Sequence, residues 1–117
     1  MQLNLSLNEH RVLLPILKSR IADYYMEIRR AMISPYKAEL KRKKKHLSAI
    51  ERMLEKLPQT DISIELTQEQ LDSLEDCIQV TLKEKASEIW HTDSARWRKN
   101  LINEKRQLNH ILAIVER

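Results

Sequence analysis

No glycine occurs among the 117 residues of this chain, so its turns must form without the residue that reaches positive φ angles most easily. Walker-type nucleotide loops and dinucleotide-binding folds need glycine close to the ligand, and both are therefore excluded. Tight primed hairpin turns are disfavoured for the same reason. Leu, Ile, Lys, Glu, Arg and Gln are abundant and favour helix, so we expect an all-α chain.

Two capping boxes predict where helices begin. Ser6 is followed three residues later by Glu9, and Thr67 is followed in the same way by Gln70. In this motif the hydroxyl accepts a hydrogen bond from a free backbone N–H, and the longer side chain reaches back to the backbone of the cap. Apolar residues at spacings of three and four follow each box. We therefore predict a helix directly after each one.

Two further helices have start signals of other kinds, and Ser34-Pro35 is a strong one. Ser34-Pro35 predicts a helix that is capped by Ser34, has Pro35 at its first position and ends before Pro58. The polar stretch at residues 92–94 supplies cap residues for a last helix. Pro15 lies inside the first helix and lacks a backbone N–H, so a kink is predicted there.

The chain also repeats itself. When it is shifted by 61 positions without gaps, both capping boxes and the apolar positions of both helices in each half coincide. The matched pairs include Leu3/Ile64, Leu13/Leu74, Leu17/Ile78, Tyr36/Trp97, Leu40/Leu101, Leu47/Leu108 and Ile50/Ile111. Any two amphipathic hairpins of similar length can be brought into register, so the pattern leaves open whether a duplication occurred.

The predicted fold is a four-helix bundle made of two helical hairpins related by a pseudo-two-fold axis. Each hairpin has an apolar face that it cannot bury alone, and docking the two faces buries both. We expect a single domain over residues 1–117, with repeats at 1–56 and 62–117. The arms at residues 3–5 and 62–66 would pair as a minimal two-stranded ribbon, and an extended hydrophobic staple is the alternative.

One polar residue interrupts the apolar seam of the second helix in each hairpin. These positions are Lys43 and its repeat partner Glu104. Our hypothesis is that they form a complementary pair near the pseudo-two-fold axis and fix how the hairpins pack. The alternative is that both side chains extend into solvent.

Charge is divided unevenly between the halves. Residues 1–60 contain 13 Lys and Arg against 6 Asp and Glu, a net charge of +7, whereas residues 61–117 contain 8 against 11, a net charge of −3. The densest basic run covers residues 41–45 and sweeps over a full helical turn, so its members cannot all face one groove. Opposite charges also permit head-to-tail association, which leaves a homodimer open.

The candidate partner contacts combine this basic stretch with neighbouring cations and aromatic residues. They are Arg29, Arg30, Lys37, Lys41, Lys44, Lys45, Tyr25 and Trp90. Tyr24 and Tyr25 are adjacent, so both cannot point into the core. Trp90 and Trp97 flank the last connection, where we expect them to cap the open end of the bundle; as exposed residues they would be interface anchors.

The pattern predicts no catalytic site, cofactor or metal. Cys77 matches Ile16 in the repeat, which favours a buried and inert thiol. Glu88-x-x-His91 has the spacing of carboxylate–histidine ligands in dimetal bundles, but the second such motif is missing. The other histidines have no histidine partner four residues away.

We therefore predict a small helical module without enzymatic activity, of a prokaryotic or phage type, that binds another protein as adaptor, inhibitor or regulator. The alternative is a nucleic-acid-binding regulator that uses the basic stretch on phosphates, although an aromatic stacking platform is missing. The single cysteine, the lack of a charged-then-apolar leader and the short apolar runs favour the cytoplasm and no membrane partner. No motif is specific enough to indicate a family.

Overall fold

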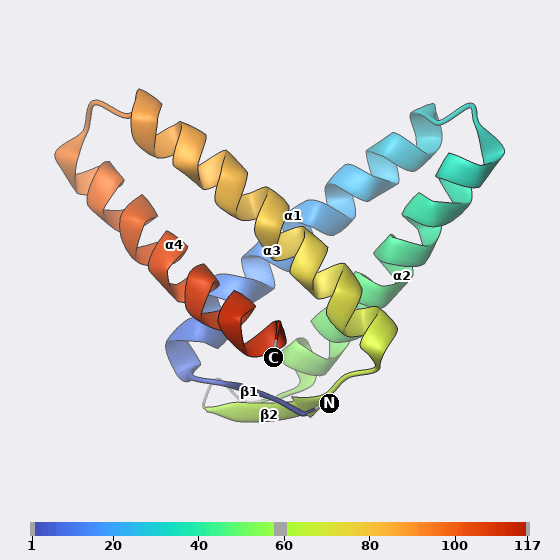
Figure 1. Ribbon diagram of the computed structural model, residues 1–117, viewed down its shortest axis with the longest axis horizontal. Coiled ribbons are helices and arrows are strands. Elements are labelled where there is room, and N and C mark those ends of the chain that lie inside the picture. Colours follow the sequence, from blue (N-terminus) through green and yellow to red (C-terminus); the bar gives the residue numbers. More distant parts are fainter. Residues whose placement is uncertain (1, 58–60, 117) are drawn as a thin grey trace.

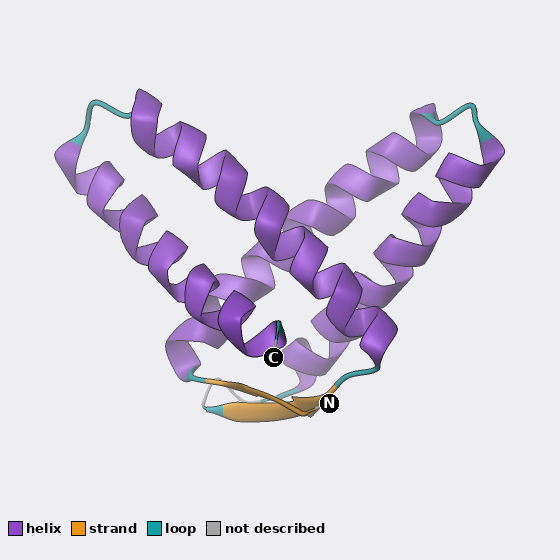
Figure 2. Cartoon of the chain, in the orientation of Figure 1, coloured by secondary structure: helices purple, strands orange, loops and turns teal. Residues whose placement is uncertain are grey.

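The computed structural model describes residues 2–57 and 61–116. The elements follow in the order β1 (Gln2–Leu5), α1 (Leu7–Arg30), α2 (Ser34–Lys56), β2 (Ile62–Glu65), α3 (Gln68–His91) and α4 (Ala95–Val115). Long helices dominate the chain, and the two strands form one short ribbon (Figure 2). α1 packs against α2 and α3 against α4, so the predicted all-α class with two helical hairpins is confirmed.

Both capping boxes are formed as predicted. Ser6 Oγ accepts from the Glu9 backbone N–H at 3.2 Å, and Glu9 Oε1 accepts from the Ser6 N–H at 2.9 Å. Thr67 and Gln70 repeat this arrangement at 3.2 and 2.9 Å. The boxes satisfy backbone donors that have no partner within the helix, and α1 and α3 begin directly after them.

The start of α2 differs from the prediction. The cap residue is Ile33, whose side chain makes no capping hydrogen bond, and Ser34 is already the first helical residue. Proline is tolerated throughout the first helical turn because the N–H groups there have no intrahelical acceptor. Pro35 therefore marks the first turn of α2 without deciding which residue caps it.

The helices end without left-handed residues. None of the described residues has a positive φ, and the residues that follow α1, α2 and α3 (Ala31, Leu57 and Thr92) have extended backbones. A chain without glycine ends its helices in this way because the usual left-handed cap is costly for other residues. Pro58, which the sequence predicts to stop α2, lies outside the described residues.

β1 and β2 pair as an antiparallel ribbon, which is the first of the two arrangements that the sequence leaves open. Leu3 lies opposite Ile64, and Leu5 lies opposite Ile62. Because Leu3 and Ile64 are themselves 61 positions apart, the two-fold axis that relates the halves passes through this pair. These side chains and Leu66 are buried, so the ribbon closes the base of the core.

The hairpins rise from the ribbon and diverge, with α1 and α3 crossing between them (Figure 1). α2 also packs against α3, and α4 against α1. Both halves contribute to one core, whose fully buried residues include Leu13, Leu17, Leu47, Leu74, Ile78 and Leu108. The bundle is therefore closed at its base and open at its tips.

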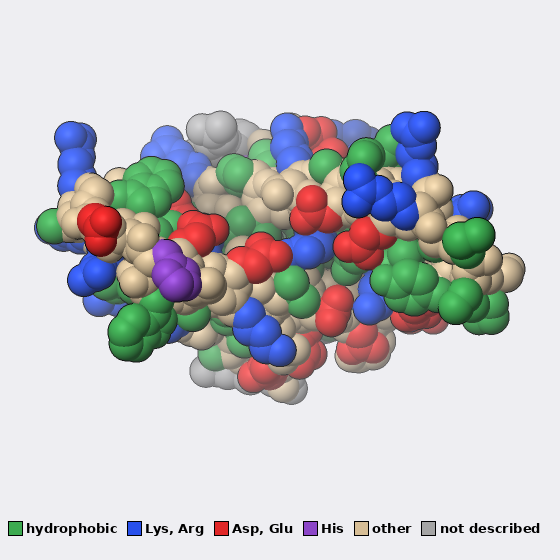
Figure 3. Space-filling model, turned by 90° about the horizontal axis from the view of Figure 1, so that it is seen from above, with side chains coloured by type: hydrophobic (Ala, Val, Ile, Leu, Met, Phe, Trp, Pro, Cys, Tyr) green, Lys and Arg blue, Asp and Glu red, His purple; other side chains and the backbone are tan. Residues whose placement is uncertain are grey.

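The two tryptophans at the open tip differ from the expectation that they cap the bundle. Trp90 is 84% exposed and Trp97 is 55% exposed, so these residues do not cap the core. The reason is the divergence of the hairpins, which carries the connection between α3 and α4 away from the ribbon (Figure 1). Hydrophobic side chains gather near both ends of the molecule when it is seen from above (Figure 3). Tyr24 is buried and Tyr25 is half exposed, as their adjacency predicts.

Candidate functional site

A groove of about 500 Å³ lies between α1 and α2. Its charged lining residues are all cations, and we call it the basic groove. The lining comprises Tyr25, Ile28 and Arg29 from α1 and Lys41, Lys44, Lys45, Ser48, Ala49 and Arg52 from α2. Within the described part of the chain, none of the five cations has a carboxylate within ion-pair distance. The groove therefore presents positive charge that intramolecular ion pairs do not neutralise.

Helical spacing brings the α2 cations together. Lys41, Lys45, Ser48 and Arg52 follow one another at intervals of four, three and four residues, which places them along one face of the helix. The opposite face carries the buried residues of α2, which are Leu40, Leu47, Ile50 and Leu54. Burial of that apolar face in the core leaves the cationic face directed toward the groove.

Tyr25 organises the cations at one end of the groove. The Arg29 guanidinium lies 5.9 Å from the centroid of its ring, and Lys44 Nζ lies 5.1 Å from it. Each such contact contributes about 0.5–1 kcal/mol at an exposed site. The half-exposed ring of Tyr25 therefore keeps two cations close together.

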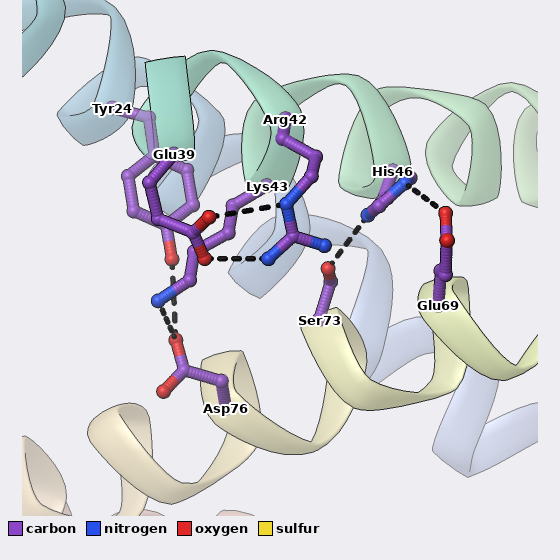
Figure 4. Close-up of polar contacts among 8 residues, drawn as sticks. All are labelled: Tyr24, Glu39, Arg42, Lys43, His46, Glu69, Ser73 and Asp76. Carbon is purple, nitrogen blue, oxygen red and sulfur yellow. Dashed lines mark hydrogen bonds and ion pairs between the residues drawn. The ribbon is translucent and has the colours of Figure 1, made fainter. Parts of the chain in front are cut away.

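The basic run at residues 41–45 divides between two faces, as its length predicts. Lys41, Lys44 and Lys45 line the groove. Arg42 binds Glu39 in the preceding turn, and Lys43 turns toward α3 (Figure 4). Only part of the run is therefore available to one ligand.

The groove brings together most, but not all, of the predicted contact residues. Tyr25, Arg29, Lys41, Lys44 and Lys45 line it. Two others, Arg30 and Lys37, do not, and Trp90 lies on α3 in the other hairpin. Sequence reasoning missed Arg52 because this residue stands outside the dense basic run. Its spacing from Lys41 and Lys45 was the available signal.

Lys43 and Glu104 do not form the predicted pair. Lys43 Nζ lies 3.5 Å from Asp76 Oδ2, and Glu104 pairs instead with Lys85 of its own hairpin (Figure 4 shows the Lys43 contact). The reason is the packing of α2 against α3 and of α4 against α3, which turns both polar seam positions toward α3. Each side chain therefore meets a partner on α3.

The contact between α2 and α3 is a polar network around Asp76 and His46 (Figure 4). Tyr24 O–H donates to Asp76 Oδ2 at 3.4 Å, beside the Lys43 ammonium. Burial, together with the nearby Asp76 carboxylate, raises the pKa of Tyr24, so the phenol stays protonated. His46 contacts Ser73 Oγ at 2.9 Å through Nδ1 and Glu69 at 3.4 Å through Nε2. This network fixes the position of α2, whose other face forms the groove.

The other candidates for chemistry are a metal site and the single thiol. Among residues 2–57 and 61–116, no group of three or more His, Cys, Asp or Glu side chains is arranged to hold a metal ion. Cys77 is fully buried, and burial raises the pKa of its thiol to about 11. No helix in the described ranges has both the length and the apolar character needed to cross a bilayer.

Comparison of the chain with family models, with curated proteins and with solved structures finds no match. Evidence about function therefore comes from the basic groove and from the surfaces near it.

Proposed function

We propose that the chain is a protein-binding module without catalytic activity of its own, which acts as an adaptor, inhibitor or regulator by docking an acidic segment of another protein in the basic groove. The observation that supports this most directly is a groove lined by five cations and no carboxylate. A partner that brings carboxylates would supply the missing counter-charges. Complementary charge of this kind speeds association and selects the partner.

The chemistry of the groove floor favours a peptide. Ile28 and Ala49 offer an apolar surface beside the cations, and Ser48 adds a hydroxyl. An acidic segment with one bulky apolar residue could place that residue on the floor and its carboxylates along the α2 cations. Interfaces commonly combine a central apolar or aromatic anchor with surrounding polar contacts.

A nucleic acid fits this groove less well. Binding of single strands usually depends on aromatic rings that stack on bases. The ring of Tyr25 already carries Arg29 and Lys44 near it, and they compete for the face that a base would use. Nucleic-acid binding, the alternative that the sequence indicates, is therefore the competing outcome of the test.

The test is fluorescence anisotropy with a labelled helical peptide of Glu and Ala that has one central Leu. A length of about 12 residues matches the roughly 17 Å from Lys41 to Arg52 at 1.5 Å per residue. We expect the peptide to bind and Lys44→Glu to weaken binding about tenfold or more, equivalent to about 1.4 kcal/mol or more. The matched control is Lys83→Glu, which reverses a charge at an exposed position of α3 and should leave binding unchanged.

The same assay is run with a single-stranded and a double-stranded oligonucleotide. If these bind with steep, log-linear salt dependence while the peptide fails to bind even at low salt, the protein-binding proposal is overturned in favour of a nucleic-acid regulator. Equal loss of peptide binding in the Lys44 and Lys83 variants would also count against the groove, because it would indicate attraction by net charge alone.

A further inference from the structure

The pseudo-two-fold axis gives the basic groove a counterpart on the second hairpin. Arg29 of α1 and Lys41 of α2 both line the groove. Their equivalents 61 positions later are Trp90 of α3 and Ile102 of α4. At the position where the first hairpin carries two cations, the second therefore carries two large apolar side chains.

The equivalence holds in three dimensions as well as in the alignment. Matched core positions are buried in both hairpins, as in Leu17/Ile78, Leu40/Leu101, Leu47/Leu108 and Ile50/Ile111. When the buried faces of two helix pairs coincide, their exposed faces coincide too, because helix geometry fixes one from the other. Residues that correspond to the groove lining should therefore share one face of the second hairpin.

Exposure and charge at this place point to a ligand. Trp90 is one of the most exposed large side chains among the described residues, and Ile102 is also exposed. Ile89, Trp90 and Arg98 line a shallow hollow of about 230 Å³. Lys105 and Arg106, three and four residues after Ile102, lie on the same side of α4.

Neither Lys105 nor Arg106 has an ion-pair partner in the described ranges. We call Trp90, Ile102, Lys105 and Arg106 the tip surface. It combines an apolar anchor point with cations that lack counter-charges. Trp90 also shares its hollow with Arg98, and Trp and Arg are enriched among energetically important interface positions.

We propose that the tip surface is a second docking site, which takes a bulky apolar side chain flanked by carboxylates. This inference rests on the proposed function. It adds a second docking site, at which apolar contact contributes more to binding than charge does. A partner with two acidic segments would then be held at both hairpins, and linkage of the two contacts would strengthen binding beyond either alone.

The test uses Trp90 as its own reporter. The chain has two tryptophans, so Trp97→Phe leaves Trp90 as the single emitting indole. The acidic peptide with a central Leu described above contains no aromatic residue and is titrated into this variant. We expect the emission of Trp90 to shift to shorter wavelength as the peptide covers it. Adding Arg106→Glu should raise the peptide concentration required for this shift about tenfold, and adding Lys44→Glu should leave it unchanged.

The outcomes separate this inference from the proposed function. If the basic groove binds the peptide by anisotropy and the emission of Trp90 does not move, the second site is wrong and the proposed function stands. A shift that Lys44→Glu abolishes would mean a single site and would overturn the inference. A shift produced by raising the protein concentration without peptide would indicate that a second copy of the chain covers the tip, which also overturns it.

Discussion

Glu9 is a buried carboxylate that links two elements at the base of the molecule. Its carboxylate accepts hydrogen bonds from the Ser6 backbone N–H and from His110, which links the start of α1 to α4. Burial acts to raise the pKa of Glu9, but these hydrogen bonds outweigh it and the pKa is lowered. A carboxylate with a depressed pKa stabilises the fold above its unfolded pKa, and the stabilisation is lost as the pH falls through the folded value.

Glu9→Gln keeps a capping-box acceptor, as Gln70 shows, but removes the charge. We therefore expect it to lower the free energy of unfolding by about 1 kcal/mol at neutral pH, the difference between a hydrogen bond to a charged group and one to a neutral group. At an acidic pH below the lowered pKa of Glu9 the wild-type carboxylate becomes protonated too, so the difference between the two proteins should shrink from the neutral to the acidic pH value. Urea unfolding at both pH values measures this. An equal difference at the two pH values would show that the charge of Glu9 contributes nothing.

Cys77 is expected to be unreactive while the chain is folded. The side chain is fully buried, and burial raises the pKa of its thiol to about 11, so little thiolate forms near neutral pH. Titration with a chromogenic disulfide reagent should show slow modification of the native protein and fast modification in urea. Fast reaction without denaturant would mean that α3 opens readily around this residue.

At the scale of the elements, the capping boxes allow a stability prediction that has a matched control variant. Thr67→Ala removes the acceptor for the Gln70 N–H and should destabilise the protein by about 1 kcal/mol. Thr92→Ala is the control, because α4 is capped by Ser94 and the Thr92 side chain has no capping role. It should change stability by less than about 0.5 kcal/mol. Thermal melts followed by circular dichroism compare the two, and similar losses would contradict the capping account.

The starts of α1 and α3 were predictable because local chemistry decides them. A hydroxyl followed three residues later by Glu or Gln determines where α1 and α3 begin, whatever packs against them later. The repeat adds long-range information, since one offset matches the arms around Leu3 and Ile64 as well as the helices. The ribbon at the axis follows from that match.

The orientation of the elements relative to one another was less predictable, and the wrong predictions about the candidate site come from this. Apolar spacing identifies the buried face of a helix but not which end of a hairpin the core covers, so the exposure of Trp90 was misjudged. The predicted pair of Lys43 and Glu104 needs their two helices side by side, whereas each side chain meets a partner on α3. The basic groove needs α1 beside α2 in a particular register, which is why Arg52 emerged only from the structure.

At the scale of the whole molecule, both halves share one core, and this predicts a single unfolding transition. Leu17 and Ile78 occupy equivalent positions and are both fully buried. Truncating either one to Ala should cost about 2–5 kcal/mol and shift one common transition. Circular dichroism and tryptophan fluorescence should report the same midpoint. Two separate transitions, with each variant moving only one, would show that the hairpins are independent units.

The division of charge also belongs to the whole molecule. The basic groove lies in the half with net charge +7, so steering of an acidic partner should favour this half. Association with the acidic peptide should accordingly slow as salt is raised, whereas dissociation should change less. Stopped-flow mixing at several salt concentrations measures both rates, and an association rate that does not respond to salt would contradict electrostatic steering.

The most direct test of the basic groove as the docking site is a chemical-shift map of the isotope-labelled chain during titration with the acidic peptide. We expect the largest amide shifts at residues 25–29 and 41–52, with their loss in Lys44→Glu, and a separate set around Trp90 and Arg106 that persists in this variant if the tip surface binds as well. Shifts that spread evenly over all exposed cations, or that appear in these ranges only when DNA is added, would contradict the account.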